Sequence, residues 1–367
     1  MKYEQKNPIP IPEAGAFSGV DSTVHSVFDW EYALRQQNLL GLYEKGKAAN
    51  WNATELDWSI DVDIERLMAE RMGTGGNLLN SLMNPPRHLD DKEATELQLN
   101  MNSFMLSQFL HGEQGALLAT AKIVQTVPGE EAKFYAASQV MDEARHVEVY
   151  HRYLTEKLGT SYPVNSGLQA LLDDILRDSR WDVTFLGMQI MVEGLALAAF
   201  GLMRMMMAGE PLIQDITTRI MADESRHVAF GVMTLESLYS GGLTGSELRE
   251  REDFVIEATH LLRERLLMEQ VFDRLGWERE VWLPWAERTP FMVGFRQMTF
   301  AKIVPNLKRL GLLTPRVRDA FEKMDLLRFE HMKDSVEEPE AQPPEELVKL
   351  LMQFLAEGGA EGQAASA

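Results

Sequence analysis

Apolar residues recur along most of the chain at intervals of three and four, which is the period of a helix with one buried face. No segment shows a convincing alternation of apolar and polar residues, the pattern of a half-buried strand. The pattern therefore predicts an all-α fold. Outside the four longest helices, the segments expected to be helical are 28–49, 60–72, 166–178, 246–275, 290–310, 315–330 and 345–357.

Four longer helices are expected in the middle of the chain, each closed by glycine or proline. Asp182 stands where it would cap the first turn of the third of them. Four adjacent helices of this length favour a four-helix bundle. The expected ranges are 91–127, 130–158, 182–209 and 211–240.

The same pattern divides the chain into four parts. Residues 1–90 form an N-terminal arm and flanking helices, and residues 91–240 form the bundle. Residues 241–331 supply additional packing helices. Residues 332–367 are an acidic, proline-containing linker, a short helix and a flexible tail rich in Gly and Ala.

The third long helix is unusually apolar. Between Val183 and Met203 the only charged residue is Glu193. This length would nearly span a membrane, but a carboxylate at its centre and the lack of basic flanking loops favour a buried core helix. An ionised carboxylate in such a place costs several kcal/mol unless it is paired or bound to metal. Glu193 is therefore a candidate metal ligand.

Composition narrows the classes of partner. The formal net charge is −20, which argues against nucleic acid and anionic membrane surfaces. The chain has no cysteine, which excludes disulfides, thiolate zinc sites and an iron–sulfur cluster of its own. Electrons must then come from a separate donor protein or reductant. The first residues lack the apolar core of a signal peptide, so we expect a cytoplasmic protein, and we expect a homodimer.

The five-residue motif Asp-Glu-Ala/Ser-Arg-His occurs twice in the bundle, at residues 142–146 and 223–227. A single glutamate precedes the Glu of each copy by about thirty residues. Glu and His three positions apart project from nearly the same side of a helix, so each copy offers one carboxylate and one imidazole to a shared centre. Two such pairs plus two further glutamates are the ligands of dinuclear iron or manganese sites in helical bundles. The candidate ligands are Glu113, Glu143, His146, Glu193, Glu224 and His227.

The pattern Glu-x-x-His also occurs at Glu148/His151 and at Glu257/His260. Neither of these two pairs belongs to the five-residue motif with its upstream glutamate. His151 also points about 140° away from His146 on the same helix. We interpret both as parts of solvated helix faces. The oxygen-rich set of six suits iron or manganese better than copper or zinc.

With these residues in place, the chain resembles the ferritin-like di-iron carboxylate oxidases and oxygenases over about residues 91–240. The superfamily includes multicomponent monooxygenase hydroxylases, arylamine N-oxygenases, desaturases and ribonucleotide reductase small subunits. The resemblance implies two Fe ions, or a Mn/Fe pair, with O₂ as co-substrate. It implies that the four glutamates are the catalytic groups and that Glu143 and Glu224 bridge the metals. Glu113 and His146 would then complete one metal, and Glu193 and His227 the other.

The resemblance also assigns outer residues. It implies that Asp223 holds His146 and Asp142 holds His227 across the bundle, with Arg145 and Arg226 neutralising the aspartates. A surface ion pair is the alternative for each Asp and Arg. The residues expected to form an apolar shell around the metals are Phe109, Leu117, Ile190, Leu197, Phe200 and Ile220.

Individual positions limit the choice of subfamily. Ile220 replaces the third histidine of arylamine N-oxygenases, and Leu197 replaces the threonine of multicomponent hydroxylases. Tyr150 matches the radical tyrosine of reductase small subunits, although an ordinary core aromatic is the alternative. We expect an enzyme that oxidises a small organic substrate with O₂ by oxygen insertion or hydrogen abstraction. A radical-generating subunit and a non-catalytic iron-binding protein are the competing interpretations.

Overall fold

The computed structural model describes residues 18–64, 66–67, 84–338 and 349. Within this part of the chain every regular element is helical and no strand occurs, which confirms the all-α prediction. Apart from residue 349, the predicted helix over 345–357 and the predicted tail lie outside the described residues. Most of the predicted helix over 60–72 does so as well.

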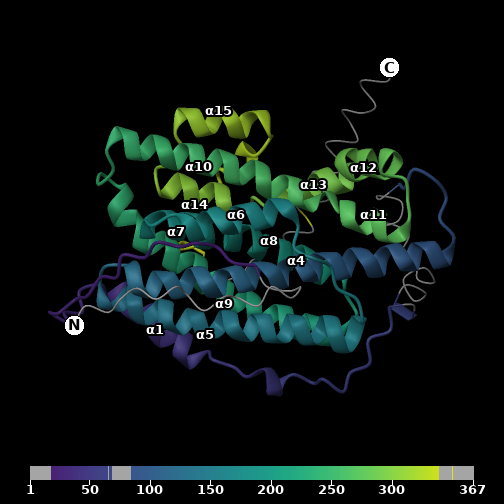
Figure 1. Cartoon of the computed structure of the whole chain (residues 1–367), viewed down its shortest axis with the longest axis horizontal. Helices are drawn as coiled ribbons and strands as arrows, with labels where there is room; N and C mark the ends of the chain where they lie inside the picture. The colour runs from purple at the N-terminus through teal and green to yellow at the C-terminus, as the bar shows by residue number, and fades with distance from the viewer. Residues whose placement is uncertain (1–17, 65, 68–83, 339–348, 350–367) are drawn as a thin grey trace.

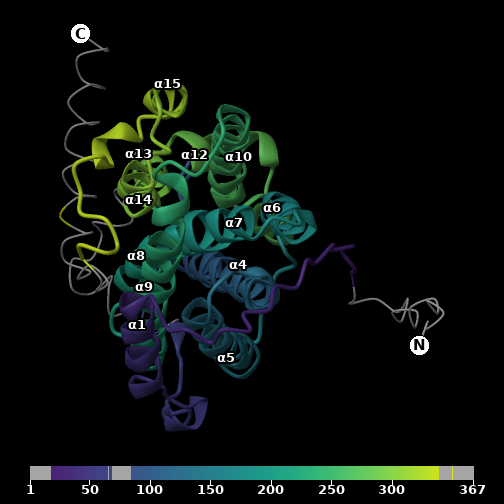
Figure 2. The same cartoon turned by 90° about the vertical axis from the view of Figure 1, so that its left-hand side faces the viewer.

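Four long helical segments form the centre of the molecule (Figures 1 and 2). The third is continuous from α7 through a π-helical segment, η3, into α8. These bounds agree with the predicted helices to within a few residues. The segments are α4 (Asp91–Thr126), α5 (Glu130–Tyr153), α7–η3–α8 (Trp181–Phe185, Leu186–Val192 and Glu193–Met206) and α9 (Pro211–Tyr239).

Local chemistry explains where these helices begin. Asp90 and Glu93 form a capping box at the start of α4, each side chain accepting from the other residue's backbone N–H. Gly129, at φ 89°, turns the chain between α4 and α5 in a conformation that few other residues adopt. The Glu210 carboxylate accepts from two backbone N–H groups at the start of α9, where Pro211 fits the first turn.

Asp182 does not cap the third helix, contrary to expectation. Arg180 occupies the N-cap position, and Asp182 lies inside the first turn of α7. Its carboxylate instead accepts from the buried guanidinium of Arg251 at 2.9–3.1 Å and from the hydroxyl of Tyr239 at 3.1 Å. A charged tertiary partner is a stronger competitor for a carboxylate than a nearby backbone N–H.

The remaining helices cover the bundle from two sides (Figure 2). Helix α1 (Gln37–Ala48) packs against α5 and α9, and the helices after α9 gather on the opposite side, next to α7 and α8. The other elements are η1 (Ala53–Glu55), η2 (Leu154–Leu158), α6 (Ser166–Arg177), α10 (Gly245–Glu264), η4 (Arg265–Leu267), α11 (Glu269–Leu275), α12 (Arg279–Arg288), α13 (Pro290–Met298), α14 (Ile303–Arg309), α15 (Pro315–Lys323) and η5 (Leu327–Phe329).

Several helix predictions outside the bundle were wrong. The helix expected over 246–275 is interrupted at Met268, and the helix expected over 315–330 ends at Lys323. The helix expected over 28–49 begins only at Gln37, and the residues before it form an extended arm. The single helix expected over 290–310 is broken between Met298 and Ile303. Helix α12 was not expected at all. It contains Pro284 in its interior, which sequence patterns count as a helix breaker.

The apolar third helix is a core helix. Its stretch from Trp181 to Arg204 is the one described helix that is long and apolar enough to cross a membrane, and 94% of the apolar window is buried inside the protein. It contacts α4 and α9 of the bundle and α10, α13 and α14 of the flanking helices. Glu193 therefore lies in the protein interior, where an unpaired charge needs a compensating partner.

Candidate metal centre

The six predicted ligands come from all four long helical segments and meet in the bundle core. None of these residues is more than 5% exposed. Glu193 is the first residue of α8, directly after the π-helical segment η3. A π-helical turn shifts the register of the side chains that follow it, and such turns often occur at functional sites. The other ligands are Glu113 on α4, Glu143 and His146 on α5, and Glu224 and His227 on α9.

His146 presents one ring nitrogen to three carboxylates. Its Nδ1 lies 3.3 Å from Glu113 Oε2, 3.2 Å from Glu224 Oε1 and 3.5 Å from Glu143 Oε2. Each distance is shorter than twice a metal–ligand bond, so one cation between these atoms could contact all of them.

His227 repeats the arrangement in the other half of the bundle. Its Nδ1 lies 3.1 Å from Glu143 Oε1 and 3.4 Å from Glu224 Oε1. Glu143 therefore turns one oxygen toward each imidazole, which is the geometry that a carboxylate needs to bridge two metals. The potential ligand atoms form two groups, and within each group all atoms lie within 4.8 Å of one another. One group is Glu113, Glu143, His146 and Glu224; the other is Glu143, Glu193 and His227.

The electrostatics of these groups favour the binding of metal cations. Burial, followed by repulsion from neighbouring carboxylates, raises the pKa of Glu113 and of Glu193 well above the ordinary range. Both oxygens of Glu224 and one oxygen each of Glu143 and Glu193 are buried without a hydrogen-bond partner. Buried acceptors without donors are rare in folded proteins, and two divalent cations would satisfy all of them. The residues present therefore fit a dinuclear metal centre.

The far nitrogen of each histidine contacts an aspartate from the opposite helix. His146 Nε2 lies 3.1 Å from Asp223 Oδ2, and His227 Nε2 lies 3.2 Å from Asp142 Oδ2. Arg145 donates to both aspartates. An aspartate at this position can fix the tautomer and the orientation of a metal-bound imidazole. The structure thus brings the residues of each predicted outer pair together.

Arg226 and Trp51 complete the surroundings of Asp223. The Arg226 guanidinium donates to Asp223 Oδ1, and the Trp51 indole N–H donates to Oδ2 at 2.8 Å. Burial alone would raise the pKa of Asp223. The hydrogen bond with His146 and the charge of His146 outweigh burial and lower this pKa. Sequence reasoning missed Trp51, which precedes α4 and is far from both motifs along the chain.

Sequence reasoning also missed Gln139. This buried side chain lies one turn before Glu143 on α5, and its amide nitrogen is 3.0 Å from Glu143 Oε1 and 3.0 Å from Glu193 Oε1. Its carbonyl oxygen has no hydrogen-bond partner. The available signal was a polar residue on the ligand face of α5, at the helical spacing i−4 from Glu143.

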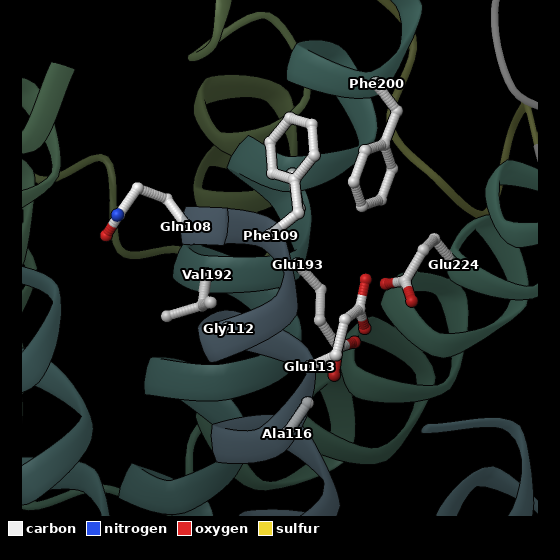
Figure 3. Close-up of a pocket in the computed structure, with 10 residues that line it drawn as sticks. Gln108, Phe109, Gly112, Glu113, Ala116, Val192, Glu193, Phe200 and Glu224 are labelled. Atoms are coloured by element: carbon white, nitrogen blue, oxygen red, sulfur yellow. The ribbon is translucent and has the colours of Figure 1, made fainter. Parts of the chain in front are cut away.

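A small cavity lies beside Glu113, Glu193 and Glu224 (Figure 3). Its volume is about 20 Å³, which is room for about one water molecule. Phe109 and Phe200 project toward it from α4 and α8, and their rings make an edge contact at 4.6 Å. The other lining residues are Gln108, Gly112, Ala116, Val192 and Ala196.

The lining differs from the predicted apolar shell. Phe109 and Phe200 line the cavity, whereas Leu117, Ile190, Leu197 and Ile220 do not. Ile190, Leu197 and Ile220 are buried core residues, and Leu117 is half-buried on α4. Helix spacing predicts the face on which a residue lies, but small residues such as Gly112 leave the open space.

Tyr150 is buried on α5, one turn beyond His146, and its ring lies 6.0 Å from that of Phe109. Its hydroxyl has no hydrogen-bond partner. Burial, followed by the charge of Glu113, raises its pKa well above the ordinary range. The two other histidines with a Glu-x-x-His pattern, His151 and His260, are exposed, which confirms their interpretation as solvated.

Comparison with known proteins gives matches among solved structures. No family model matches the chain, and no curated protein matches it. Among solved structures, the chain is similar to a mutant of an R2-like ligand-binding oxidase with an anaerobically reconstituted Mn/Fe cofactor. The identity is 18%, the TM-score is 0.47, and the match covers 74% of this chain and 92% of that chain. The four helices and six buried side chains described above have the arrangement of a ferritin-like dinuclear carboxylate centre.

Proposed function

We propose that this protein is a dinuclear iron or manganese/iron oxidoreductase that uses O₂ to oxidise a small organic substrate. One observation carries the proposal: four carboxylates and two imidazoles, all buried, converge beside a cavity with apolar walls. A bound pair of such metals would supply electrons to O₂ and an oxidising centre for the substrate. Oxygen insertion, N-oxygenation and desaturation are all consistent with this centre.

The side chains of the protein would hold the centre rigid. Asp142 and Asp223 orient the imidazoles, and Arg145 and Arg226 balance the charge of the aspartates. These contacts would keep the ligand side chains in place to hold a pair of metals. Phe109 and Phe200 narrow the cavity and limit the access of water to the metals.

The cavity limits the substrate. A volume of about 20 Å³ admits O₂ or water but no organic molecule. A larger substrate would therefore need lining side chains, such as Phe109 or Phe200, to move. The walls offer few polar groups other than the metal ligands, so a compact and mainly apolar substrate fits best. The necessary electrons would come from a separate donor protein or reductant, because the chain has no cysteine for an iron–sulfur cluster.

A radical-generating subunit is the second candidate, and Tyr150 supports it. This tyrosine is buried near Glu113 and His146, and its hydroxyl is unpaired, so one-electron oxidation would leave a protected radical. A non-catalytic iron-binding protein is the third candidate. The closed metal site and the additional helices around the bundle argue against storage of iron in bulk.

The decisive experiment supplies ferrous iron and manganese to metal-free protein under anaerobic conditions. O₂ uptake is then measured with a chemical reductant and a panel of compact apolar compounds. An oxidase should consume O₂ repeatedly and accelerate with a substrate that is recovered in oxidised form. O₂ uptake that stops after one turnover per centre and leaves a stable tyrosyl radical would support the second candidate. Accumulation of many ferric ions per chain would support the third.

A further inference from the structure

Another cavity lies between the N-terminal arm, residues 18–36, and the turn that joins α4 to α5. Its volume is about 310 Å³, which is large enough for a small organic molecule. Gln125 of α4 also lines it, and more than three helical turns, or roughly 18 Å, separate Gln125 from Glu113 on the same helix. This cavity is therefore separate from the metal centre. The residues that give it its chemistry are Phe28, Asp29, Trp30 and Tyr32 of the arm and Glu130 and Lys133 of α5.

The arm is held against the bundle on both sides of this cavity. The backbone N–H of Val27 donates to Gln125 O at 2.8 Å. Farther along the arm, the backbone N–H of Gln36 donates to Glu131 Oε1 at 2.7 Å. The walls are thus formed before a ligand arrives, which lowers the entropic cost of binding.

Three aromatic side chains of the arm line the cavity and are open to solvent. Phe28, Trp30 and Tyr32 are 69%, 71% and 65% exposed, more than any other large apolar side chain among the described residues. The rings of Phe28 and Trp30 stack, with centroids 4.9 Å apart and planes 4° apart. Tyr32 has φ 53°, a conformation that a non-glycine residue keeps only where its surroundings hold it. Open aromatic faces attract cations and flat apolar groups.

The charged groups of the cavity favour a cation. Asp29 and Glu130 both line it, and neither forms an ion pair with another described residue. One oxygen of Asp29 accepts a backbone N–H at 3.0 Å, so the other remains open to a ligand. Lys133 is the one basic residue of the lining, and its ammonium donates to two backbone oxygens near the end of α4, at 3.2 and 3.5 Å. Two carboxylates and one ammonium leave the cavity with a net negative charge.

We propose that this cavity binds a small organic cation with an aromatic body, of the arylalkylammonium class. The aromatic body would lie against the open rings of the arm, and the ammonium would pair with Asp29 and Glu130. An anionic ligand would meet two carboxylates on a chain of net charge −20, which opposes its binding. An uncharged ligand would leave both carboxylates unpaired. The proposal is independent of the chemistry at the metal centre.

Calorimetric titration of the full, metal-loaded chain with phenethylammonium tests the proposal. The matched probes are 2-phenylethanol, which is neutral, and 3-phenylpropanoate, in which a carboxylate replaces the ammonium. Phenethylammonium should bind saturably, the alcohol several-fold more weakly, and the propanoate not measurably. Metal-free protein should bind phenethylammonium equally well. Absence of saturable binding, equal or tighter binding of either matched probe, or a requirement for bound metal would each overturn the proposal.

Single substitutions locate the bound cation. Asp29→Asn and Glu130→Gln should each weaken binding of phenethylammonium, and Trp30→Ala should weaken it about 2–5-fold, as expected for a cation–π contact at an exposed site. Lys133→Gln should strengthen binding, because it removes a repelling charge while its amide can still donate. Glu280→Gln, an exposed position on α12, is the control and should bind as the wild type does. Wild-type affinity in both carboxylate variants, or weaker binding in Lys133→Gln with unchanged helicity, would overturn the assignment.

Discussion

The side-chain amide nitrogen of Gln139 lies 3.0 Å from Oε1 of Glu193, although the two residues belong to different helices of the bundle. The same nitrogen lies 3.0 Å from Glu143 Oε1. Gln139 thus ties α5 to α8 at the metal centre and holds two of the carboxylates that face His227. No comparable amide contact occurs on the side of His146 among the described residues.

This asymmetry leads to the first prediction. Gln139→Leu should weaken binding of the metal held by Glu143, Glu193 and His227 by about 10–100-fold, the usual loss for a residue that orients ligands. The other metal should be bound nearly as in the wild type. Titration of metal-free protein with ferrous or manganous ions, followed by calorimetry, measures both sites.

The matched control for this variant is Gln189→Leu. Gln189 is also buried, lies one turn before Glu193, and makes no hydrogen bond to any ligand. Equal losses of affinity in the Gln139 and Gln189 variants would show that the effect comes from packing and not from the amide contact.

The second prediction concerns the carboxylates between the histidines. Glu143 and Glu224 each lie within 3.5 Å of both His146 and His227, so removal of either should prevent retention of the second metal. Elemental analysis of Glu143→Ala and Glu224→Ala should give no more than one metal per chain. His151→Ala should bind metal as the wild type does. Two tightly bound metals in either Glu variant would contradict the bridging role.

The third prediction distinguishes the two aspartates. Asp223 accepts from Trp51, Arg145 and Arg226 as well as contacting His146, and it is more deeply buried than Asp142. Asp223→Ala should therefore cost more metal affinity and more stability than Asp142→Ala. The loss of affinity should be about 10–100-fold for either variant. Trp51→Phe removes one donor only and should have a smaller effect. Wild-type metal affinity in both Asp variants would rule out the orienting role.

The fourth prediction concerns Tyr150. If the protein is an oxidase, Tyr150→Phe should change the rate of substrate oxidation only slightly, because the ring and its contacts with Phe109 and Phe200 remain. If the protein generates a radical, oxygenation of the ferrous form should give a persistent tyrosyl signal in the EPR spectrum, which Tyr150→Phe would remove. We expect the first result.

The fifth prediction is a pH dependence of the metal-free protein. The raised pKa values of Glu113 and Glu193 mean that the folded chain keeps protons that the unfolded chain releases above about pH 4.3. The raised pKa values of His146 and His227 act in the same direction above about pH 6.5. Above about pH 4.3, the free energy of unfolding should therefore fall as the pH rises, and it should fall more steeply above about pH 6.5. Denaturant titrations at several pH values above about pH 4.3 measure this free energy.

A mutation and bound metal should each change this dependence of the free energy of unfolding on pH. Glu193→Gln removes one of the raised groups and should flatten the dependence, and bound metal should reverse it, because cations replace the protons. The lowered pKa values of Glu143 and Asp223 act below about pH 4, outside this range. A metal-free protein whose stability rises with pH above about pH 4.3 would contradict the account.

The sequence by itself determined the helices of the bundle and the set of candidate ligands. Local signals suffice for both: the spacing of Glu143 and His146 places them on one side of a helix, and Pro128 followed by Gly129 marks the end of α4. The apolar surroundings of Glu193 in the sequence likewise indicate burial in any helical fold.

Only the tertiary structure decided which atoms meet. Trp51 and Asp223 lie 172 residues apart, and Gln139 and Glu193 lie 54 residues apart, so no local pattern links them. Asp182 had the sequence position of a helix cap, but Arg251 from a distant helix binds its carboxylate. The cavity depends on small lining residues such as Gly112, because empty space arises from how side chains of different helices pack. Periodicity predicts the face of a helix, while packing determines its partner.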